Sequence, residues 1–345
     1  MQSDYQSSNN TQIAWWLLFV CAAIFIMLVI GGATRLTHSG LSMMTWDPLM
    51  GWIPPLSEEA WLDSFAHYKQ IPEFFELNPD MDLQGYKGIF MLEYIHRVWG
   101  RLIGMFFLLP FLYFMFAGKI SKALRPKLIV MFLLGGMQGL LGWYMVSSGF
   151  DNPHVSQYRL TAHLIAAFII FTYIFWTALG LLYPTSEASL YAVGRLKKLT
   201  TWLAALVAVT ITAGGFVAGL KAGFAYNTFP LMDGHFVPEG YAMIEPFYLN
   251  FFENIAAVQF DHRILAESTL LCIIAIWFYA RRFELVGRAR LGFNLMLAMG
   301  AIQFLLGVTT LLMEVPVPLG VAHQGGAMIL FAVVLYTRHA LRTPE

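Results

Sequence analysis

Eight long apolar stretches constrain this 345-residue chain more than any other feature of its sequence. A helix needs about 20 apolar residues to cross the hydrocarbon core of a bilayer, and each stretch is long enough and is bounded by polar or Pro- and Gly-rich sequence. With 58% hydrophobic and only 12% charged residues, the chain exceeds what a soluble domain needs to fill its core. We therefore predict an all-α integral membrane protein with eight transmembrane helices, at 14–33, 88–116, 128–148, 159–183, 201–219, 254–280, 291–313 and 318–337.

The loop charges predict how the chain is oriented in the membrane. Segments 118–127, 184–200 and 281–290 are rich in Lys and Arg, whereas 34–87 holds eight acidic residues against three basic ones. By the positive-inside rule, both termini are expected in the cytoplasm. The first dozen residues contain no Lys or Arg and resemble no targeting sequence, so a bacterial cytoplasmic (inner) membrane is expected. The equal numbers of basic and acidic residues, 21 each, indicate no nucleic-acid partner.

The long outer loop, 34–87, has helical periodicity around Trp61, Phe65 and Tyr68. This pattern predicts short amphipathic helices lying over the outer face. Cys21 and Cys272 both fall inside apolar stretches, where a thiol behaves as a small hydrophobic group. No disulfide is therefore expected in the loops.

The two halves of the chain repeat one another. Glycines and glutamines recur at matched positions, pairing Gly31 with Gly214, Gly142 with Gly307 and Gln138 with Gln303. Four helices per repeat give both repeats the same orientation, which predicts two similar four-helix bundles, 1–190 and 191–345, related by a pseudo-twofold axis along the membrane normal. The glycines allow close helix packing or make room for a flat macrocycle. The aligned segments are 30–51 with 213–234, 93–97 with 259–263, 135–142 with 300–307, and 161–164 with 321–324.

Four of the nine histidines lie inside the predicted spans. Histidines in a membrane interior are functional candidates, because burying an unsatisfied polar ring in hydrocarbon is costly. A hydrogen-bonded core histidine explains any one of them equally well. Four in the outer half of the bilayer, down to a depth of about 12 Å, favour a shared function. The four are His96, His163, His262 and His323, and the five assigned to loops or the tail are His38, His67, His154, His235 and His339.

Two facing histidines in each bundle suit a haem iron ligated by two imidazoles. Imidazole also binds Zn, Cu and Ni. A tetrahedral Zn site would be two ligands short, however, and no Cys or paired carboxylate stands at ligand spacing nearby. Haem supplies four nitrogens itself and requires only two from the protein.

Charged residues accompany the histidines. Arg97 and Arg263 directly follow His96 and His262, and Arg101 lies one turn further along the first of these helices. Arginines here could pair with haem propionates, or they could extend toward lipid head groups.

Glu93 lies three residues before His96, on the same helix face. Its partner in the repeat is Gln259, so an ionisable group occurs in the first bundle only; Asp261 has no acidic counterpart, since Ile95 takes its place. A buried carboxylate beside a metal cofactor can act as a general base or stabilise charge. An ion pair with Arg97 or Arg101 explains it equally well.

Several segments resemble the signature segments of haem A synthases: EYIHRVWGRLIG (93–104), YNTFPLMDG (226–234), FDHRI (260–264) and AHQGGAMIL (322–330). The resemblance covers nearly the whole chain and extends to the first loop, which is similar to that of the proteobacterial and mitochondrial members. Another branch of the family carries a cysteine pair in this loop, and 34–87 contains no Cys. A mechanism that relies on that pair is therefore not expected.

The resemblance implies a membrane oxidoreductase. It would convert the C8 methyl group of haem O to the formyl group of haem A, by two hydroxylations and loss of water, and supply the product to cytochrome oxidase. It further implies that the first bundle binds the substrate haem, near the outer (periplasmic) face, between His96 and His163, with Glu93 as the catalytic carboxylate. In the second bundle His262 and His323 would ligate the iron of haem b.

The implied partners are haem O, which a haem O synthase would deliver, and an electron acceptor that receives electrons through the haem b bundle. The sequence leaves the acceptor and a homo-oligomeric state open. Two alternative functions use the same histidines. One is a non-enzymatic dihaem cytochrome that only transfers electrons, and the other is a haem carrier or transporter.

Overall fold

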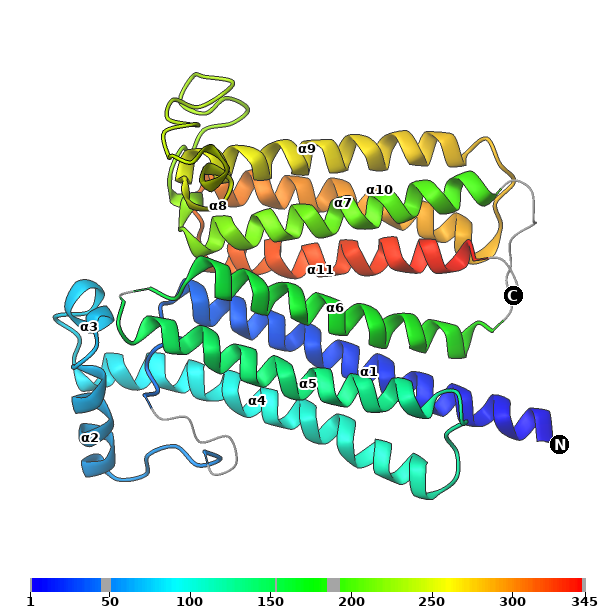
Figure 1. Cartoon of the computed structure of the whole chain (residues 1–345), viewed down its shortest axis with the longest axis horizontal. Helices are drawn as coiled ribbons and strands as arrows, with labels where there is room; N and C mark the ends of the chain where they lie inside the picture. Colours follow the sequence, from blue (N-terminus) through cyan, green and yellow to red (C-terminus); the bar gives the residue numbers. More distant parts are fainter. Residues whose placement is uncertain (1, 45–50, 153, 185–192, 343–345) are drawn as a thin grey trace. The chain divides into compact units, whose positions relative to one another are not determined.

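A computed structural model describes residues 2–44, 51–152, 154–184 and 193–342, and within these ranges it contains eight helices long and apolar enough to cross a membrane. Helices suit this environment because they satisfy their own backbone hydrogen bonds in lipid. The eight predicted spans are confirmed as α1, α4, α5, α6, α7, α9, α10 and α11 (Figure 1). The α-helices are α1 (Gln2–Leu36), α2 (Glu58–Tyr68), α3 (Pro72–Leu77), α4 (Leu83–Phe116), α5 (Arg125–Val146), α6 (Gln157–Leu182), α7 (Val193–Gly219), α8 (Asn250–Glu253), α9 (Ile255–Ala280), α10 (Gly287–Leu312) and α11 (Val317–Ala340).

The chain divides into two compact units. The first unit is Phe19–Ile170, and the second comprises Met1–Leu18 with Phe171–Glu345. Helices α1 and α6 therefore each contribute to both units. The predicted boundary between residues 190 and 191 lies outside the described residues, and the division into bundles of 1–190 and 191–345 stays a prediction.

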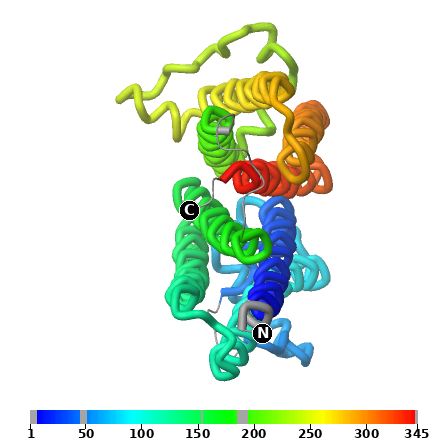
Figure 2. Tube along the Cα trace, turned by 90° about the vertical axis from the view of Figure 1, so that its right-hand side faces the viewer, coloured from blue at the N-terminus to red at the C-terminus, as the bar shows by residue number. Residues whose placement is uncertain are grey.

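In the second unit, α7, α9, α10 and α11 form a four-helix bundle in which each helix contacts its two neighbours (Figures 1 and 2). Glycines of α10 permit the close contacts. A Cβ at Gly292 would lie 2.6 Å from Oγ1 of Thr337 on α11, and one at Gly300 would lie 2.8 Å from Cδ1 of Ile273 on α9. Small residues are used in this way between membrane helices because they let the backbones approach.

In the first unit, α4 packs against α5, and α2 packs against α4. Short helices were predicted in the 34–87 loop, and α2 and α3 are present there. The side-chain oxygens of Ser57 and Asp82 cap the first turns of α2 and α4. An aromatic cluster, the loop core, joins the loop to α4; it comprises Leu41, Phe65, Tyr68, Ile71, Phe74, Tyr86 and Phe90.

Tyr68 forms the polar centre of the loop core. Its buried hydroxyl donates to Oε1 of Glu73 at 3.2 Å and accepts from Nδ2 of Asn78 at 2.8 Å. Burial, followed by the nearby charge of Glu73, raises the pKa of Tyr68 well above its ordinary value. The hydroxyl therefore stays protonated and keeps both bonds at neutral pH.

Substitution Tyr68→Phe is expected to loosen α2 and α3 without unfolding the transmembrane helices. The variant loses the hydrogen bonds of the Tyr68 hydroxyl to Glu73 and Asn78. This loss lowers the free energy of local unfolding by about 1.5 kcal/mol, which corresponds to roughly tenfold faster local amide exchange. Hydrogen exchange measured by mass spectrometry on residues 58–77 would test this. Tyr248→Phe, at a tyrosine that is 60% exposed, is the control. Equal exchange in both variants would contradict the role given to Tyr68.

Candidate functional site

Each of the four intramembrane histidines lies against a glycine of a neighbouring helix. In the second unit, a Cβ at Gly214 of α7 would lie 3.0 Å from Cε1 of His262 on α9, and one at Gly307 of α10 would lie 2.8 Å from Cε1 of His323 on α11. Both distances are shorter than ordinary van der Waals contact. A side chain on either glycine would therefore displace the imidazole.

Two further contacts between a histidine and a glycine occur in the first unit, an ordinary van der Waals contact at Gly31 and a shorter one at Gly142. A Cβ at Gly31 of α1 would lie 3.4 Å from Nε2 of His96 on α4, and one at Gly142 of α5 would lie 3.0 Å from Cε1 of His163 on α6. These glycines are the ones that the internal repeat pairs with the two glycines of the second unit. The sequence identified the glycines as matched positions, but it did not reveal that the histidine rings rest on them.

In the second unit the two histidines face one another. The ring centroids of His262 and His323 lie 6.4 Å apart with their planes at 84°. Two imidazoles on opposite sides of one metal ion, with metal–nitrogen bonds of about 2 Å, would have centroids about 6 Å apart. Nδ1 of His262 lies 3.1 Å from the carbonyl oxygen of Thr210. A proton on Nδ1 would satisfy this bond and leave the lone pair of Nε2 for a metal.

A glutamine joins the helices of the histidine pairs in both units. Nε2 of Gln138 on α5 donates to the carbonyl oxygen of His163 at 2.8 Å, and Nε2 of Gln303 on α10 donates to that of His323 at 2.9 Å. The nitrogen of Gln303 also lies 3.1 Å from Nδ1 of His323. The glutamines were matched by the repeat, and the structure gives them equivalent contacts at the level of the histidines.

The donor atoms fit haem better than a bare metal ion. Among the described residues, no group of three or more His, Cys, Asp or Glu side chains is placed to hold a metal. Zinc sites in proteins use three or four such ligands, whereas haem iron needs at most two. The residues present therefore fit a haem held between two imidazoles.

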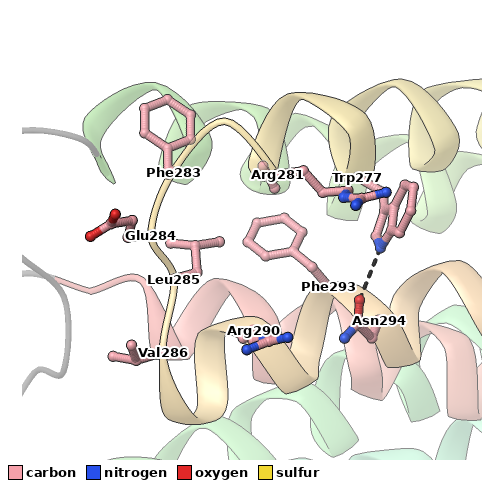
Figure 3. A pocket seen from close by; sticks show the side chains of 10 residues that line it. Trp277, Arg281, Phe283, Glu284, Leu285, Val286, Arg290, Phe293 and Asn294 are labelled. Carbon is pink, nitrogen blue, oxygen red and sulfur yellow. Dashed lines mark hydrogen bonds between the residues drawn. The ribbon is translucent and has the colours of Figure 1, made fainter.

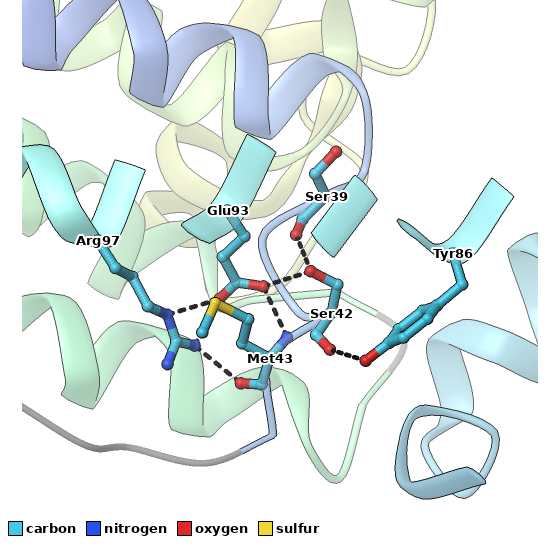
Figure 4. Close-up of polar contacts among 6 residues, drawn as sticks. All are labelled: Ser39, Ser42, Met43, Tyr86, Glu93 and Arg97. Carbon is cyan, nitrogen blue, oxygen red and sulfur yellow. Dashed lines mark hydrogen bonds and ion pairs between the residues drawn. The ribbon is translucent and has the colours of Figure 1, made fainter. Parts of the chain in front are cut away.

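Glu93 lies at the centre of a buried polar network (Figure 4). Its Oε1 accepts from Nε and Nη2 of Arg97 at 3.0 and 2.5 Å, and its Oε2 accepts from the Ser42 hydroxyl at 2.7 Å and the Met43 backbone N–H at 2.8 Å. Arg97 also donates to the carbonyl oxygen of Met43 at 2.8 Å. The ion pair with Arg97 is thus present, and together with it the carboxylate fastens the loop after α1 to α4.

Gln259 occupies the corresponding place in the second unit. Its Nε2 donates to the carbonyl oxygens of Ala222 and Ala225 at 2.8 and 2.5 Å, and its Oε1 accepts from Nη2 of Arg263 at 3.1 Å. Arg263 donates in addition to the carbonyl oxygens of Tyr226 and Thr228 at 2.5 and 2.7 Å. The amide and the arginine fasten the loop after α7 to α9.

The two loop attachments are built alike but have opposite hydrogen-bond polarity. The repeat pairs Met43 with Tyr226, and each accepts from the arginine of its own unit. It also pairs His38 with Lys221, and both adopt the left-handed conformation, with φ of 53° and 55°. The first loop presents N–H and O–H donors to the carboxylate, whereas the second presents carbonyl acceptors to the amide. These loop partners could not be identified from the sequence.

The remaining charged candidates contact the loops that precede α4 and α9. The guanidinium of Arg101 lies 5.6 Å from the ring centre of Trp52. The hydroxyl of Tyr241 donates to Oδ1 of Asp261 at 2.9 Å. Burial, this hydrogen bond and the carboxylate charge raise the pKa of Tyr241 to about 12, so it remains a donor at neutral pH. Propionate pairing by Arg97, Arg101 and Arg263 stays a prediction.

One histidine was wrongly assigned. His339 was expected in the polar tail, but it lies in the last turn of α11 and is fully buried. Its ring packs edge to face with Trp176 of α6, with centroids 5.0 Å apart. The sequence around it is basic, and its burial depends on contact with a distant helix.

Substitution Gly142→Ala is expected to displace the His163 ring and weaken haem retention by about tenfold, within the 1–3 kcal/mol typical of overpacking. Gly139→Ala is a matched control, because a Cβ at Gly139 has nothing within 4 Å and the two changes alter helix propensity equally. The visible absorption spectrum and haem content of the purified variants measure the difference. Equal haem content in both variants would contradict the contact described for Gly142.

Comparison with known proteins agrees with these features. Residues 14–335 match the COX15-CtaA family, described as cytochrome oxidase assembly proteins. The haem A synthase of Nitrosospira multiformis is 49% identical, over 99% of this chain and 96% of that protein. The haem A synthase of Nitrosomonas eutropha is 48% identical, over 97% and 95%. The haem A synthase COX15 of Arabidopsis thaliana is 44% identical, over 96% and 74%. The chain therefore belongs to the haem A synthase family of cytochrome oxidase assembly proteins.

Proposed function

We propose that this multi-pass membrane protein is an oxidoreductase that converts the C8 methyl group of haem O to the formyl group of haem A. The observation that carries the proposal is the pair of histidines in each unit, every ring resting on a glycine, in a chain similar to haem A synthases over nearly its full length. A dihaem cytochrome or a haem carrier could use the same ligands. The relatives favour the synthase, because those compared above are named for this activity.

The two histidine pairs have different roles in this proposal. His96 and His163 hold the substrate haem, and His262 and His323 hold haem b. When bound, haem b supplies a one-electron carrier through which electrons leave. The separation of 6.4 Å between the His262 and His323 rings and the bond from His262 to Thr210 support the second assignment.

We further propose that the helices form two bundles related by a pseudo-twofold axis along the membrane normal. The first comprises α1, α4, α5 and α6 (1–190), and the second comprises α7, α9, α10 and α11 (191–345). Four matched contacts between histidine and glycine and two matched glutamine bonds support this repeat. The basic loops support the proposal that both termini lie in the cytoplasm of a bacterium, with the haem sites near the periplasmic face.

Glu93 is the catalytic carboxylate in this proposal. It lies one turn from His96, is 2% exposed, and has a neutral counterpart in the second unit. Two side chains and a backbone N–H donate four hydrogen bonds to it, so it can accept a proton only after a donor withdraws. The Ser42 hydroxyl is the donor best able to do so, because it can rotate to its second partner, the carbonyl oxygen of Ser39 at 2.9 Å.

Substitution Glu93→Gln is expected to lower haem A production by at least about 100-fold, the usual contribution of a general acid or base. Haem content is expected to fall by less than about tenfold, because the amide nitrogen would oppose one buried donor. Ser42→Ala is the control, because it removes one hydrogen bond to Glu93 but keeps the carboxylate; activity within about fivefold of the parent is expected, from the loss of roughly 1 kcal/mol. Pigments extracted from the purified proteins and separated by chromatography give the haem O, haem A and haem B content.

Full haem A production by Glu93→Gln would remove the catalytic role. An equal loss of activity in both variants would indicate that Glu93 and Ser42 only hold the loop after α1 in place. If the parent protein yields haem B without haem O, haem A or a hydroxylated intermediate, the electron-transfer cytochrome becomes the better description.

Substitutions His262→Ala and His323→Ala are each expected to abolish the low-spin b-type absorption, because a six-coordinate iron needs both imidazoles. His235→Ala changes an exposed loop histidine of the same unit and should leave the spectrum unchanged. The reduced-minus-oxidised difference spectrum of each purified variant measures the outcome. A b-type spectrum that persists in either span variant would refute this placement of haem b.

A further inference from the structure

The end of the second unit where α9 leads into α10 contains a cavity that the proposed function does not use. Residues from the last turn of α9, the 281–286 connection and the first two turns of α10 line it, and its volume is about 600 Å³ (Figure 3). This is within the range of roughly 300–1,000 Å³ that small-molecule sites occupy. The lining combines two arginines with aromatic and aliphatic side chains.

The two arginines make the cavity electropositive. Arg281 and Arg290 come from the two different helix ends, and the Phe293 ring lies between them (Figure 3). Arg281 also lies over the Trp277 ring, 4.9 Å from its centre. Glu284 is the acidic residue of the lining, and its carboxylate points away from both arginines. In the described part of the chain, neither arginine forms a salt bridge with a carboxylate.

The cavity lies at the ends of two candidate membrane spans, where head groups would replace hydrocarbon. The span of α9 ends at Ala280 and that of α10 begins at Gly287, so the lining includes the last residues of one span and the first of the next. Phe293 and Ala280, 2% and 3% exposed, form the closed floor of the lining, and the half-buried Trp277 and Leu285 form its apolar wall. Trp277, whose indole N–H donates to Oδ1 of Asn294 at 3.0 Å, is a residue type enriched at this depth.

We propose that this cavity binds the head group of an anionic phospholipid of the cytoplasmic leaflet. The phosphate would lie between Arg281 and Arg290, and the glycerol and upper acyl chain would lie against Trp277, a half-buried aromatic residue of the lining. Basic pockets between membrane helices on the cytoplasmic side are suited to such lipids. A free anion would make no use of the apolar wall, which is why the lipid is the occupant proposed. The lipid site does not involve the haem-binding residues, so the lipid-binding proposal can be wrong while the proposed function is right.

Lipid binding by the full-length protein in detergent tests the proposal. Native mass spectrometry counts the phosphatidylglycerol retained, with phosphatidylcholine as the zwitterionic comparison and inorganic phosphate as the competing free anion. Arg281→Gln and Arg290→Gln are each expected to weaken phosphatidylglycerol binding about fivefold, the effect of one basic residue near a membrane surface. Arg282→Gln is the matched control. It removes the same charge from the same connection, at an exposed residue outside the lining, and a change of less than about twofold is expected.

Three results would overturn the proposal. An equal loss in Arg282→Gln would indicate a diffuse surface charge, equal retention of phosphatidylcholine would remove the selectivity for an anion, and displacement of the lipid by inorganic phosphate at the same concentration would indicate a free-anion site. The comparison of phosphatidylglycerol with phosphatidylcholine uses the parent protein alone. It therefore tests the selectivity for an anionic lipid even if a variant folds poorly. An unchanged haem spectrum in the variants shows that they are intact.

Discussion

An imidazole ring packed directly on the backbone of a facing helix is the contact on which the rest of the structure depends. Membrane helices gain no hydrophobic driving force from one another, so their register must come from close packing and polar bonds. Each histidine supplies the bulk and each glycine the space, and Gln138 and Gln303 add a hydrogen bond to the backbone at the same level. The contact that positions each imidazole is therefore also a contact that sets the spacing of its helix pair.

The loops after α1 and α7 are part of this arrangement. The loop after α1 is fastened to α4 by Glu93, and the loop after α7 is fastened to α9 by Gln259, in each case three residues before one of the four intramembrane histidines. The helices α2 and α3 extend the first attachment through the loop core, since the Tyr86 hydroxyl donates to the carbonyl oxygen of Ser42 at 3.1 Å. Movement of this loop would therefore be transmitted to the helix turn that carries His96.

The eight spans and the short helices of 34–87 could be predicted because apolar length and periodicity are local properties of a sequence. The four histidines could be selected because the repeat supplied an internal comparison. Contacts that depend on distant segments could not be predicted. Ser42 reaches Glu93 across 51 positions, and His339 packs against Trp176 of another helix. The hydrogen-bond polarity of each loop could not be predicted for the same reason. Nearly every residue carries the same backbone N–H and carbonyl groups, so residue identity does not tell which of them faces a side chain.

The opposite polarity of the two loops has an evolutionary consequence. A change of Gln259 to glutamate would set a carboxylate against two carbonyl oxygens, and a change of Glu93 to glutamine would set an amide nitrogen against an N–H group. Neither repeat can acquire the other's residue in a single step without leaving a buried polar group in conflict. For one repeat to adopt the other's arrangement, the side chain and the conformation of its loop would have to change together.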